Sequence, residues 1–204
     1  MMEIPSKKGF IQRQDDLTEG GMKLNDRDRL LMLLQTEALE VRSVILSSGR
    51  TSDYYIDCKR VTLTPEGAYL TAKLMLEKIQ PDASAIGGLT LGADPIVSSI
   101  SVLSYIQGRN MPALIVRKEP KKHGTKSFIE GPKLEKGSRI AVVEDVVTTG
   151  GSILLAIERI AMEGYQPVQA LSILDRLEGG RETLETRGFK LESLFTKNDL
   201  KINK

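Results

Sequence analysis

The segment that decides the fold is residues 140–152, which read Ile-Ala-Val-Val-Glu-Asp-Val-Val-Thr-Thr-Gly-Gly-Ser. Four apolar residues in succession predict a strand that is buried on both faces. Two acids, Glu144 and Asp145, stand at its carboxyl end, and a turn of threonines and glycines leads into a predicted helix over 151–162. Helix N-termini favour phosphate because they offer unpaired N–H groups and a partial positive charge. The segment therefore predicts a phosphate-binding loop whose carboxylates accept hydrogen bonds from sugar hydroxyls.

Strands and helices alternate on both sides of this segment. Strands are predicted over 83–88, 113–117, 139–144 and 168–174, and helices over 65–79, 93–106 and 151–162. Thr64 suits the N-cap position of the first of these helices, with Pro65 at its first position. Upstream, 26–39 has helical periodicity, and two short β-like runs flank a turn at 47–50. Such alternation is typical of an α/β fold with an open, mostly parallel sheet and helices on both faces.

Composition bounds the class of protein. A chain of 204 residues favours one domain. Residues 1–22 lack apolar periodicity, so we expect a flexible N-terminal extension before a domain over 23–204. The one cysteine, Cys58, indicates a reducing compartment. No run reaches about 18 apolar residues and no secretory signal opens the chain, so we expect a cytoplasmic protein that contacts no membrane. A net charge of +2 argues against nucleic acid as a partner.

A basic run follows the predicted strand 113–117. Five cations and the only histidine fall within ten residues, namely Arg117, Lys118, Lys121, Lys122, His123 and Lys126. Read alone, a charge run is more often a solvated face of the protein. Beside a phosphate loop, these cations would instead stabilise the negative charge that develops on a polyanionic leaving group. A long polar loop over 118–137 would carry them.

These motifs together resemble the type I phosphoribosyltransferases. The segment 140–152 is similar to their phosphoribosyl pyrophosphate motif, and the basic run resembles the R-K-x-x-K-x-H-G signature of the orotate enzymes within that family. The resemblance implies a type I phosphoribosyltransferase-like open sheet with a small N-terminal hood, formed mainly by 23–64 and the C-terminal strand. It also implies transfer of the phosphoribosyl group of phosphoribosyl pyrophosphate to orotate, giving orotidine 5′-monophosphate and pyrophosphate in de novo pyrimidine (UMP) biosynthesis.

The resemblance implies roles for individual residues. Lys121 and His123 are expected to be catalytic. The expected ligands of phosphoribosyl pyrophosphate are Arg117, Lys118, Lys121, His123, Glu144, Asp145, Val146, Val147, Thr148, Thr149, Gly150, Gly151 and Ser152. Thr148 and Arg176 are expected to bind orotate, whose carboxylate suits an arginine fork. Magnesium is the implied cofactor, held mostly by substrate oxygens and waters, so no protein residue is assigned as a metal ligand. A homodimer that shares the basic loop between subunits is also implied.

Two further segments match the family less completely. Residues 48–55 resemble the S-G-x-x-S-x-Y stretch of the hood, where Tyr55 would either stack on the pyrimidine or sit in the core. Residues 87–92 would offer backbone N–H groups to pyrophosphate. Many relatives have a lysine where this chain has Ser47, and some have one where it has Gly92, so neither position receives a ligand role.

Three alternatives stay open at this point. The first is a uracil or purine phosphoribosyltransferase, but the basic signature and Arg176 argue against it. The second is a non-enzymatic regulator that senses phosphoribosyl pyrophosphate and binds DNA, although no DNA-binding domain is recognisable. The third is a subunit with an inactive site, which the intact acids and basic loop disfavour.

Overall fold

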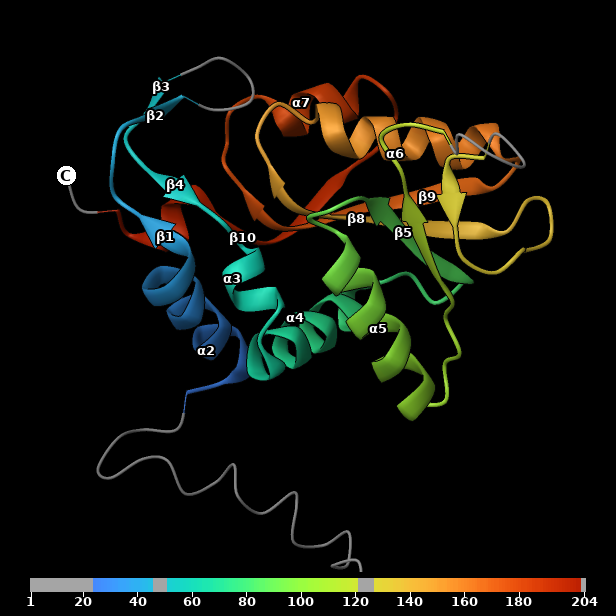
Figure 1. Cartoon of the computed structure of the whole chain (residues 1–204), viewed down its shortest axis with the longest axis horizontal. Helices are drawn as coiled ribbons and strands as arrows, with labels where there is room; N and C mark the ends of the chain where they lie inside the picture. The colour runs from blue at the N-terminus through green and yellow to red at the C-terminus, as the bar shows by residue number, and fades with distance from the viewer. Residues whose placement is uncertain (1–23, 46–50, 121–126, 203–204) are drawn as a thin grey trace, which may run out of the picture.

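The computed structural model describes residues 24–45, 51–120 and 127–202. Its centre is a six-stranded sheet in the order β10-β9-β8-β5-β6-β7 (Figure 1). The strands are β5 (Ala85–Leu89), β6 (Ala113–Val116), β7 (Ile129–Glu130), β8 (Arg139–Val147), β9 (Gln166–Asp175) and β10 (Leu191–Thr196). Five strands run parallel, and only β7 is antiparallel to its neighbour β6. The predicted open, mostly parallel α/β sheet is confirmed.

Helices cover both faces of this sheet, as Figure 1 shows. On one face lie α4 (Pro65–Lys78) and α5 (Asp94–Ile106), and on the other lie α6 (Gly151–Met162) and α7 (Gly180–Glu185). Side chains of β8 alternate between the two cores: Ala141 and Val143 join one hydrophobic cluster, and Ile140 and Val142 join the other. Because both faces are buried, the middle of the strand, residues 140–143, is apolar at every position, which is why the sequence showed a continuous apolar run there.

The helix boundaries follow from local chemistry. Thr64 accepts a hydrogen bond from the N–H of Gly67 at 3.1 Å, and Pro65 occupies the first position of α4. A side chain at Gly67 would meet the carbonyl of Val61, so the glycine permits close packing of α4 against α3 (Lys59–Thr62). The predictions for helices 65–79 and 151–162 are confirmed to within a residue.

The N-terminal residues form a small unit beside the sheet. Helix α2 (Asp26–Leu33) continues as a π-helical turn, η2 (Leu34–Ala38). Two short antiparallel pairs follow: β1 (Leu39–Glu40) with β4 (Tyr55–Ile56), and β2 (Val44–Ile45) with β3 (Thr51–Ser52). Strands form in both of the predicted β-like runs, β2 in the first and β4 in the second, but these two strands do not pair with each other. The turn at 47–50 lies outside the described residues, as does the extension 1–22.

Two expectations were wrong. The C-terminal strand, β10, does not belong to the hood but pairs with β9 at the edge of the main sheet, because Leu191 and Phe195 each bury in one of the two cores. β10 still contacts the N-terminal unit, because Arg27 donates to the carbonyl oxygen of Leu194 at 3.3 Å and lies 4.7 Å from the centre of the Phe195 ring. The following 3-10 helix, η3 (Lys197–Leu200), adds the ion pair of Asp199 with Arg27. The predicted loop 118–137 also contains a strand, β7, which pairs with β6.

Candidate active site

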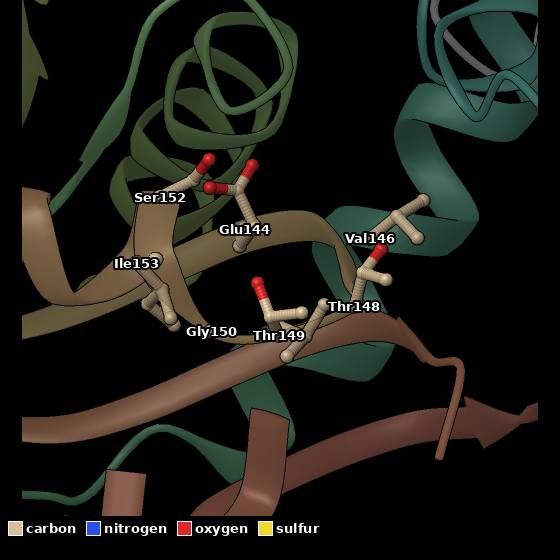
Figure 2. Close-up of a pocket in the computed structure, with 9 residues that line it drawn as sticks. Glu144, Val146, Thr148, Thr149, Gly150, Ser152 and Ile153 are labelled. Atoms are coloured by element: carbon tan, nitrogen blue, oxygen red, sulfur yellow. The ribbon is translucent and has the colours of Figure 1, made fainter. Parts of the chain in front are cut away.

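The predicted phosphate loop forms a pocket at the carboxyl end of β8. The cavity has a volume of about 290 Å³ and is lined by Glu144, Val146, Val147, Thr148, Thr149, Gly150, Gly151, Ser152 and Ile153. In Figure 2 the carboxylate of Glu144 and the hydroxyls of Thr149 and Ser152 point toward the same space. Helix α6 begins at Gly151, so the backbone N–H groups of its first turn face this loop. The structure thus brings together hydroxyl donors, a helix N-terminus and a carboxylate.

Glycines let the loop pack tightly against the start of α7. Gly150 has a left-handed backbone with φ of +86°, and a β-carbon there would lie 3.1 Å from the carbonyl oxygen of Gly180. A β-carbon on Gly180 would lie 2.8 Å from the carbonyl oxygen of Thr148. Positions 150 and 180 therefore require residues without side chains, and this packing explains Gly150 in the turn between β8 and α6.

The two acids differ in environment. Glu144 is only 5% exposed, its Oε1 accepts the N–H of Asp145 at 3.2 Å, and its buried Oε2 has no hydrogen-bond partner among the described residues. Burial, together with the charge of Asp145, raises the pKa of Glu144 well above its ordinary value, against the opposing charge of Lys118. Asp145 is oriented by the N–H of Val146, which donates to its Oδ1 at 2.8 Å. The site thus holds a buried oxygen that a donor from a ligand would satisfy.

The segment 87–92 lies against these acids. A β-carbon on Gly92 would be 2.5 Å from Oδ1 of Asp145, so the backbone of the segment directly contacts that carboxylate. The hydroxyl of Thr90 donates to Asp94 at 2.8 Å, which ties the segment to the first turn of α5. The segment 87–92 therefore lies beside the acids of β8, and its predicted role in offering backbone N–H groups to pyrophosphate stays a prediction.

Only part of the basic run can be placed. Arg117 follows β6 directly, and its Nη1 binds Glu130 at 2.9 Å. The charge of Lys118 acts on Glu144, which places this cation near the acids. Lys121 and His123, the predicted catalytic residues, lie outside the described residues, as do Lys122 and Lys126.

Sequence reasoning missed a cation at this edge of the sheet. Lys59, at the start of α3, forms an ion pair with Asp57, with 2.6 Å between Nζ and Oδ1. Partial burial lowers the pKa of Lys59, but the bond to Asp57 and the charge of Asp145 raise it overall. No motif marks this lysine, because its relation to Asp145 depends on how the N-terminal unit meets the sheet.

Arg176 lies just beyond β9, beside both the phosphate loop and the hood. It is only 2% exposed, and its N–H donates to the carbonyl oxygen of Val147 at 2.9 Å. Its guanidinium donates to Glu178 at 2.9 Å and to the hydroxyl of Ser52 at 2.8 Å. It also stacks over the ring of Tyr54 at 4.1 Å. Arg176 therefore contacts the predicted hood segment through Ser52 and Tyr54. Its ion pair with Glu178 is largely buried, since the two side chains are 3% and 19% exposed.

The two neighbouring tyrosines of the hood segment have different surroundings. Tyr55, for which the sequence leaves stacking on the pyrimidine and burial in the core open, is half-buried beneath Arg42, whose guanidinium lies 5.1 Å from the ring centre. Tyr54 is the residue that faces Arg176, and its buried hydroxyl has no hydrogen-bond partner among the described residues. Burial raises the pKa of Tyr54. The hydroxyl of Tyr54 is thus a second buried polar atom near the site that a ligand would satisfy.

Metal ligands and membrane-spanning helices are the remaining features that bear on function. In the described ranges, no three His, Cys, Asp or Glu side chains lie close enough together to hold a metal ion. Magnesium commonly uses one or two carboxylates together with substrate phosphates and waters, and the pair of Glu144 and Asp145 fits such a role. No described helix combines the length and apolar character needed to cross a bilayer.

The fold and the site define the class of protein. An adenine phosphoribosyltransferase from Leishmania donovani shares the fold, with a TM-score of 0.64 at 19% identity. The orotate phosphoribosyltransferase of Mycobacterium tuberculosis, solved in complex with Fe(III) dicitrate, superposes with a TM-score of 0.76 at 38% identity, covering 87% of this chain and all of that one. The complex of the same enzyme with phosphoribosyl pyrophosphate superposes with a TM-score of 0.71 at 36% identity, covering 86% and 99%. The chain thus has the phosphoribosyltransferase fold.

Curated relatives narrow this class. The orotate phosphoribosyltransferase of Thermosynechococcus vestitus is 51% identical over 174 residues, which cover 85% of this chain and 92% of that protein. That of Aquifex aeolicus is 43% identical over 183 residues, covering 88% and 100%. A scan against protein-family models gave no match. The chain belongs to the orotate phosphoribosyltransferase family, so the family inferred from the sequence motifs is confirmed.

Proposed function

We propose that the pocket at the end of β8 is where this chain joins orotate to the ribose of phosphoribosyl pyrophosphate, giving orotidine 5′-monophosphate and pyrophosphate. This transfer, a step of pyrimidine biosynthesis, is the activity of the family to which the chain belongs. One observation supports this pocket as the site of the reaction. The phosphate loop lies beside two carboxylates, one of which has a buried oxygen without a partner among the described residues.

The phosphate loop would bind the 5′-phosphate. The hydroxyls of Thr148, Thr149 and Ser152, with the backbone of Gly150 and Gly151, surround a space at the N-terminus of α6, and Val146 and Val147 complete its lining. Fixed donors of this kind need little reorganisation when an anion binds, because the backbone already directs them. The 5′-phosphate would then place the ribose ring over Glu144 and Asp145.

The two acids would accept hydrogen bonds from the ribose hydroxyls. The unpartnered oxygen of Glu144 costs free energy in the free protein, and a sugar hydroxyl would remove that cost. The same carboxylates fit a magnesium ion held mainly by substrate oxygens and waters. When bound, that ion would neutralise charge on the pyrophosphate leaving group.

The reaction would proceed by substitution at C1′. The C1′–O bond breaks, and its electron pair leaves with pyrophosphate. N1 of orotate gives up its proton to the pyrophosphate or to solvent and forms the new bond to C1′ with the electron pair of the broken N–H bond. Arg117, Lys118, Lys121 and His123 would stabilise the departing pyrophosphate, with Lys121 and His123 as the catalytic residues and His123 assisting proton transfer. No covalent enzyme intermediate is needed: burial raises the pKa of Cys58 well above its ordinary value, so its thiol is unsuited to act as a nucleophile.

Arg176 and Thr148 would bind orotate between the phosphate loop and the hood. An arginine fork suits the carboxylate of orotate, and the guanidinium of Arg176 lies where the hood residues Ser52 and Tyr54 meet the end of β9. The residues from 24 to 64 would form this hood over the base, as an N-terminal subdivision of one domain.

A homodimer is part of the proposal. Val102, Tyr105 and Ile106 lie three and four residues apart on one face of α5, and they are 64%, 75% and 72% exposed. Large apolar side chains grouped in this way favour burial against a partner, and Leu91 adds to them from the neighbouring loop. A second copy of the chain would cover this face and exchange its basic loop.

A cytoplasmic location is proposed on the basis of the single unpaired cysteine.

The test follows the absorbance of orotate after protein, magnesium, orotate and phosphoribosyl pyrophosphate are mixed. We expect loss of orotate with matching release of pyrophosphate, and strong slowing in Lys121→Ala. Lys133→Ala removes an exposed lysine from the same polar stretch and serves as the matched control. Consumption of uracil or a purine in place of orotate would overturn the substrate assignment and leave the fold unaffected.

A further inference from the structure

The residues that flank the basic segment 118–126 pair with each other in the sheet. β6 and β7 are antiparallel, with Val116 opposite Ile129, and the N–H of Arg117 donates to the carbonyl oxygen of Phe128 at 2.8 Å. Arg117 and Phe128, which flank the segment on its two sides, are therefore neighbours in a hairpin. Whatever holds this hairpin base fixes the two points between which the segment runs.

One end is held by Arg159 of α6. Its Nη1 donates to the carbonyl oxygen of Arg117, and its guanidinium lies 4.2 Å from the centre of the Phe128 ring. A single side chain thus contacts both strands of the hairpin base. The side chain of Arg117 is in turn directed by its ion pair with Glu130 at 2.9 Å.

The other end is held by Glu163, four residues further along the chain. Its Oε1 accepts the hydroxyl of Ser127 at 2.7 Å and the N–H of Phe128 at 3.2 Å. The hydroxyl of Ser127 also accepts the N–H of Ile129 at 3.0 Å, which closes the turn into β7. Because residues four apart share one face of a helix, Arg159 and Glu163 hold the hairpin base together.

The same helix starts at the phosphate loop. Arg159 and Glu163 come eight and twelve residues after Gly151, or about 12 and 18 Å along the axis at 1.5 Å per residue. A helix of this length with a buried apolar face is rigid. α6 therefore connects the cradle for the substrate phosphate to the base of the segment that carries the pyrophosphate-binding cations.

We propose that Arg159 and Glu163 are positioning residues for the transfer reaction: they fix both ends of the basic segment on α6 and so set where its cations act. This inference rests on the proposed function of Lys121 and His123. Neither Arg159 nor Glu163 lines the phosphate pocket, so their effect on catalysis acts through the segment that they hold.

The experiment is a double-mutant cycle on kcat/KM for phosphoribosyl pyrophosphate. Arg159→Met keeps the apolar stem but removes the donor, and Glu163→Gln is the milder change at the second contact. We expect each to lower kcat/KM about tenfold, since misplacing catalytic groups by about 1 Å has effects of this order or larger. Arg187→Met is the matched control, because Arg187 pairs with α6 through the exposed Glu158 at 3.5 Å, away from the hairpin, and should leave activity unchanged.

The decisive measurement adds Arg159→Met to Lys121→Ala. If Arg159 acts through the basic segment, the second change causes little further loss, because the cation that it positions is already absent. A loss that multiplies in full would show that Arg159 supports the site in another way and would overturn the inference. Full activity of Lys121→Ala alone would instead contradict the proposed function, and the inference would fall with it. Melting temperatures of all variants identify any that merely unfold.

Discussion

Replacing Arg176 tests whether the buried guanidinium recognises orotate or only supports the fold. The group is 2% exposed and donates to Glu178 at 2.9 Å and to Ser52 at 2.8 Å. Lysine preserves the positive charge but lacks the planar fork that binds a carboxylate through two parallel hydrogen bonds. Arg176→Lys therefore removes the geometry of recognition while changing the charge of the site least.

The expected magnitude follows from the lost contact. A hydrogen bond to a charged group contributes roughly 1.5–3 kcal/mol, and each 1.4 kcal/mol corresponds to about tenfold in affinity. We therefore expect Arg176→Lys to raise the KM for orotate about 10- to 100-fold, with a much smaller change in the KM for phosphoribosyl pyrophosphate. Steady-state kinetics with each substrate varied in turn measure both quantities.

Glu178→Gln is the control that separates the two roles of Arg176. It breaks the ion pair yet leaves the guanidinium and its bond to Ser52. Because the Glu178 side chain is 19% exposed, part of the lost interaction is replaced by water, and we expect a loss of about 1 kcal/mol in unfolding free energy. The KM for orotate should stay unchanged or fall. Equal increases in this KM for Arg176→Lys and Glu178→Gln would refute the assignment and leave Arg176 as a structural partner of Glu178.

Three other predictions concern the phosphate loop, the acids and the metal. Gly150→Ala and Gly108→Ala both place a side chain on a left-handed backbone, at a cost of about 1–2 kcal/mol, but only Gly150 has a close neighbour, 3.1 Å away; both should lower the melting temperature, and only Gly150→Ala should raise the KM for phosphoribosyl pyrophosphate. Burial beside Asp145 raises the pKa of Glu144, so the stability contributed by its neutral form is present below the ordinary pKa and lost as pH rises through the raised value. The melting temperature of the free wild type should therefore fall relative to Glu144→Gln as the pH rises above 4.5, the ordinary pKa of a glutamate carboxyl, and parallel curves would contradict this reasoning. Chelation by EDTA should stop turnover, with recovery on adding magnesium, while the melting temperature of the free protein stays unchanged; a fall would reveal a structural metal instead.

The sequence allowed prediction of the parts of the fold whose physics is local. β8 is recognisable because residues 140–143 form a continuous apolar run, and α6 because it starts after a glycine turn in which Gly150 has a left-handed backbone. Their predicted function as a phosphate site needed no tertiary contact, since a helix N-terminus and its preceding loop are neighbours in the chain. α4 was equally clear from Thr64 and Pro65.

The elements whose presence, bounds or place escaped prediction have weak local signals. β10 buries Leu191, Leu194 and Phe195 at irregular intervals, which matches neither strict alternation nor a continuous apolar run. α7 has six residues and β7 two, so neither is long enough to show a period. β10 and β7 form because each pairs with an edge of the folded sheet, and α7 forms because it covers the sheet. Both conditions arise only once the core has folded.

The surroundings of Arg176 and Asp145 were unpredictable for a different reason. Arg176 meets Ser52 across 124 residues of sequence, and no motif relates the two. The choice of Tyr54 over Tyr55 depends on which face of a two-residue strand turns inward. Lys59 faces Asp145 only because α3 lies at the carboxyl edge of the sheet. Sequence motifs therefore identified individual ligands, whereas the residues that hold them come from long-range packing.

Gly92 offers a last test, because some relatives have a lysine there and a simple reading of the family would predict that Gly92→Lys improves the enzyme. The structure predicts the opposite. A β-carbon at this position would lie 2.5 Å from Oδ1 and 2.6 Å from Cγ of Asp145, whose carboxylate is held at 2.8 Å by the N–H of Val146. Any side chain must displace this acid, at a cost of about 1–3 kcal/mol, and the ribose would lose its hydrogen-bond acceptor. We expect Gly92→Ala and Gly92→Lys to lower kcat/KM for phosphoribosyl pyrophosphate by about tenfold or more, since 1.4 kcal/mol corresponds to about tenfold. Full activity in Gly92→Lys would show that Asp145 has room to move, and that its contact with Gly92 does not determine how the ribose binds.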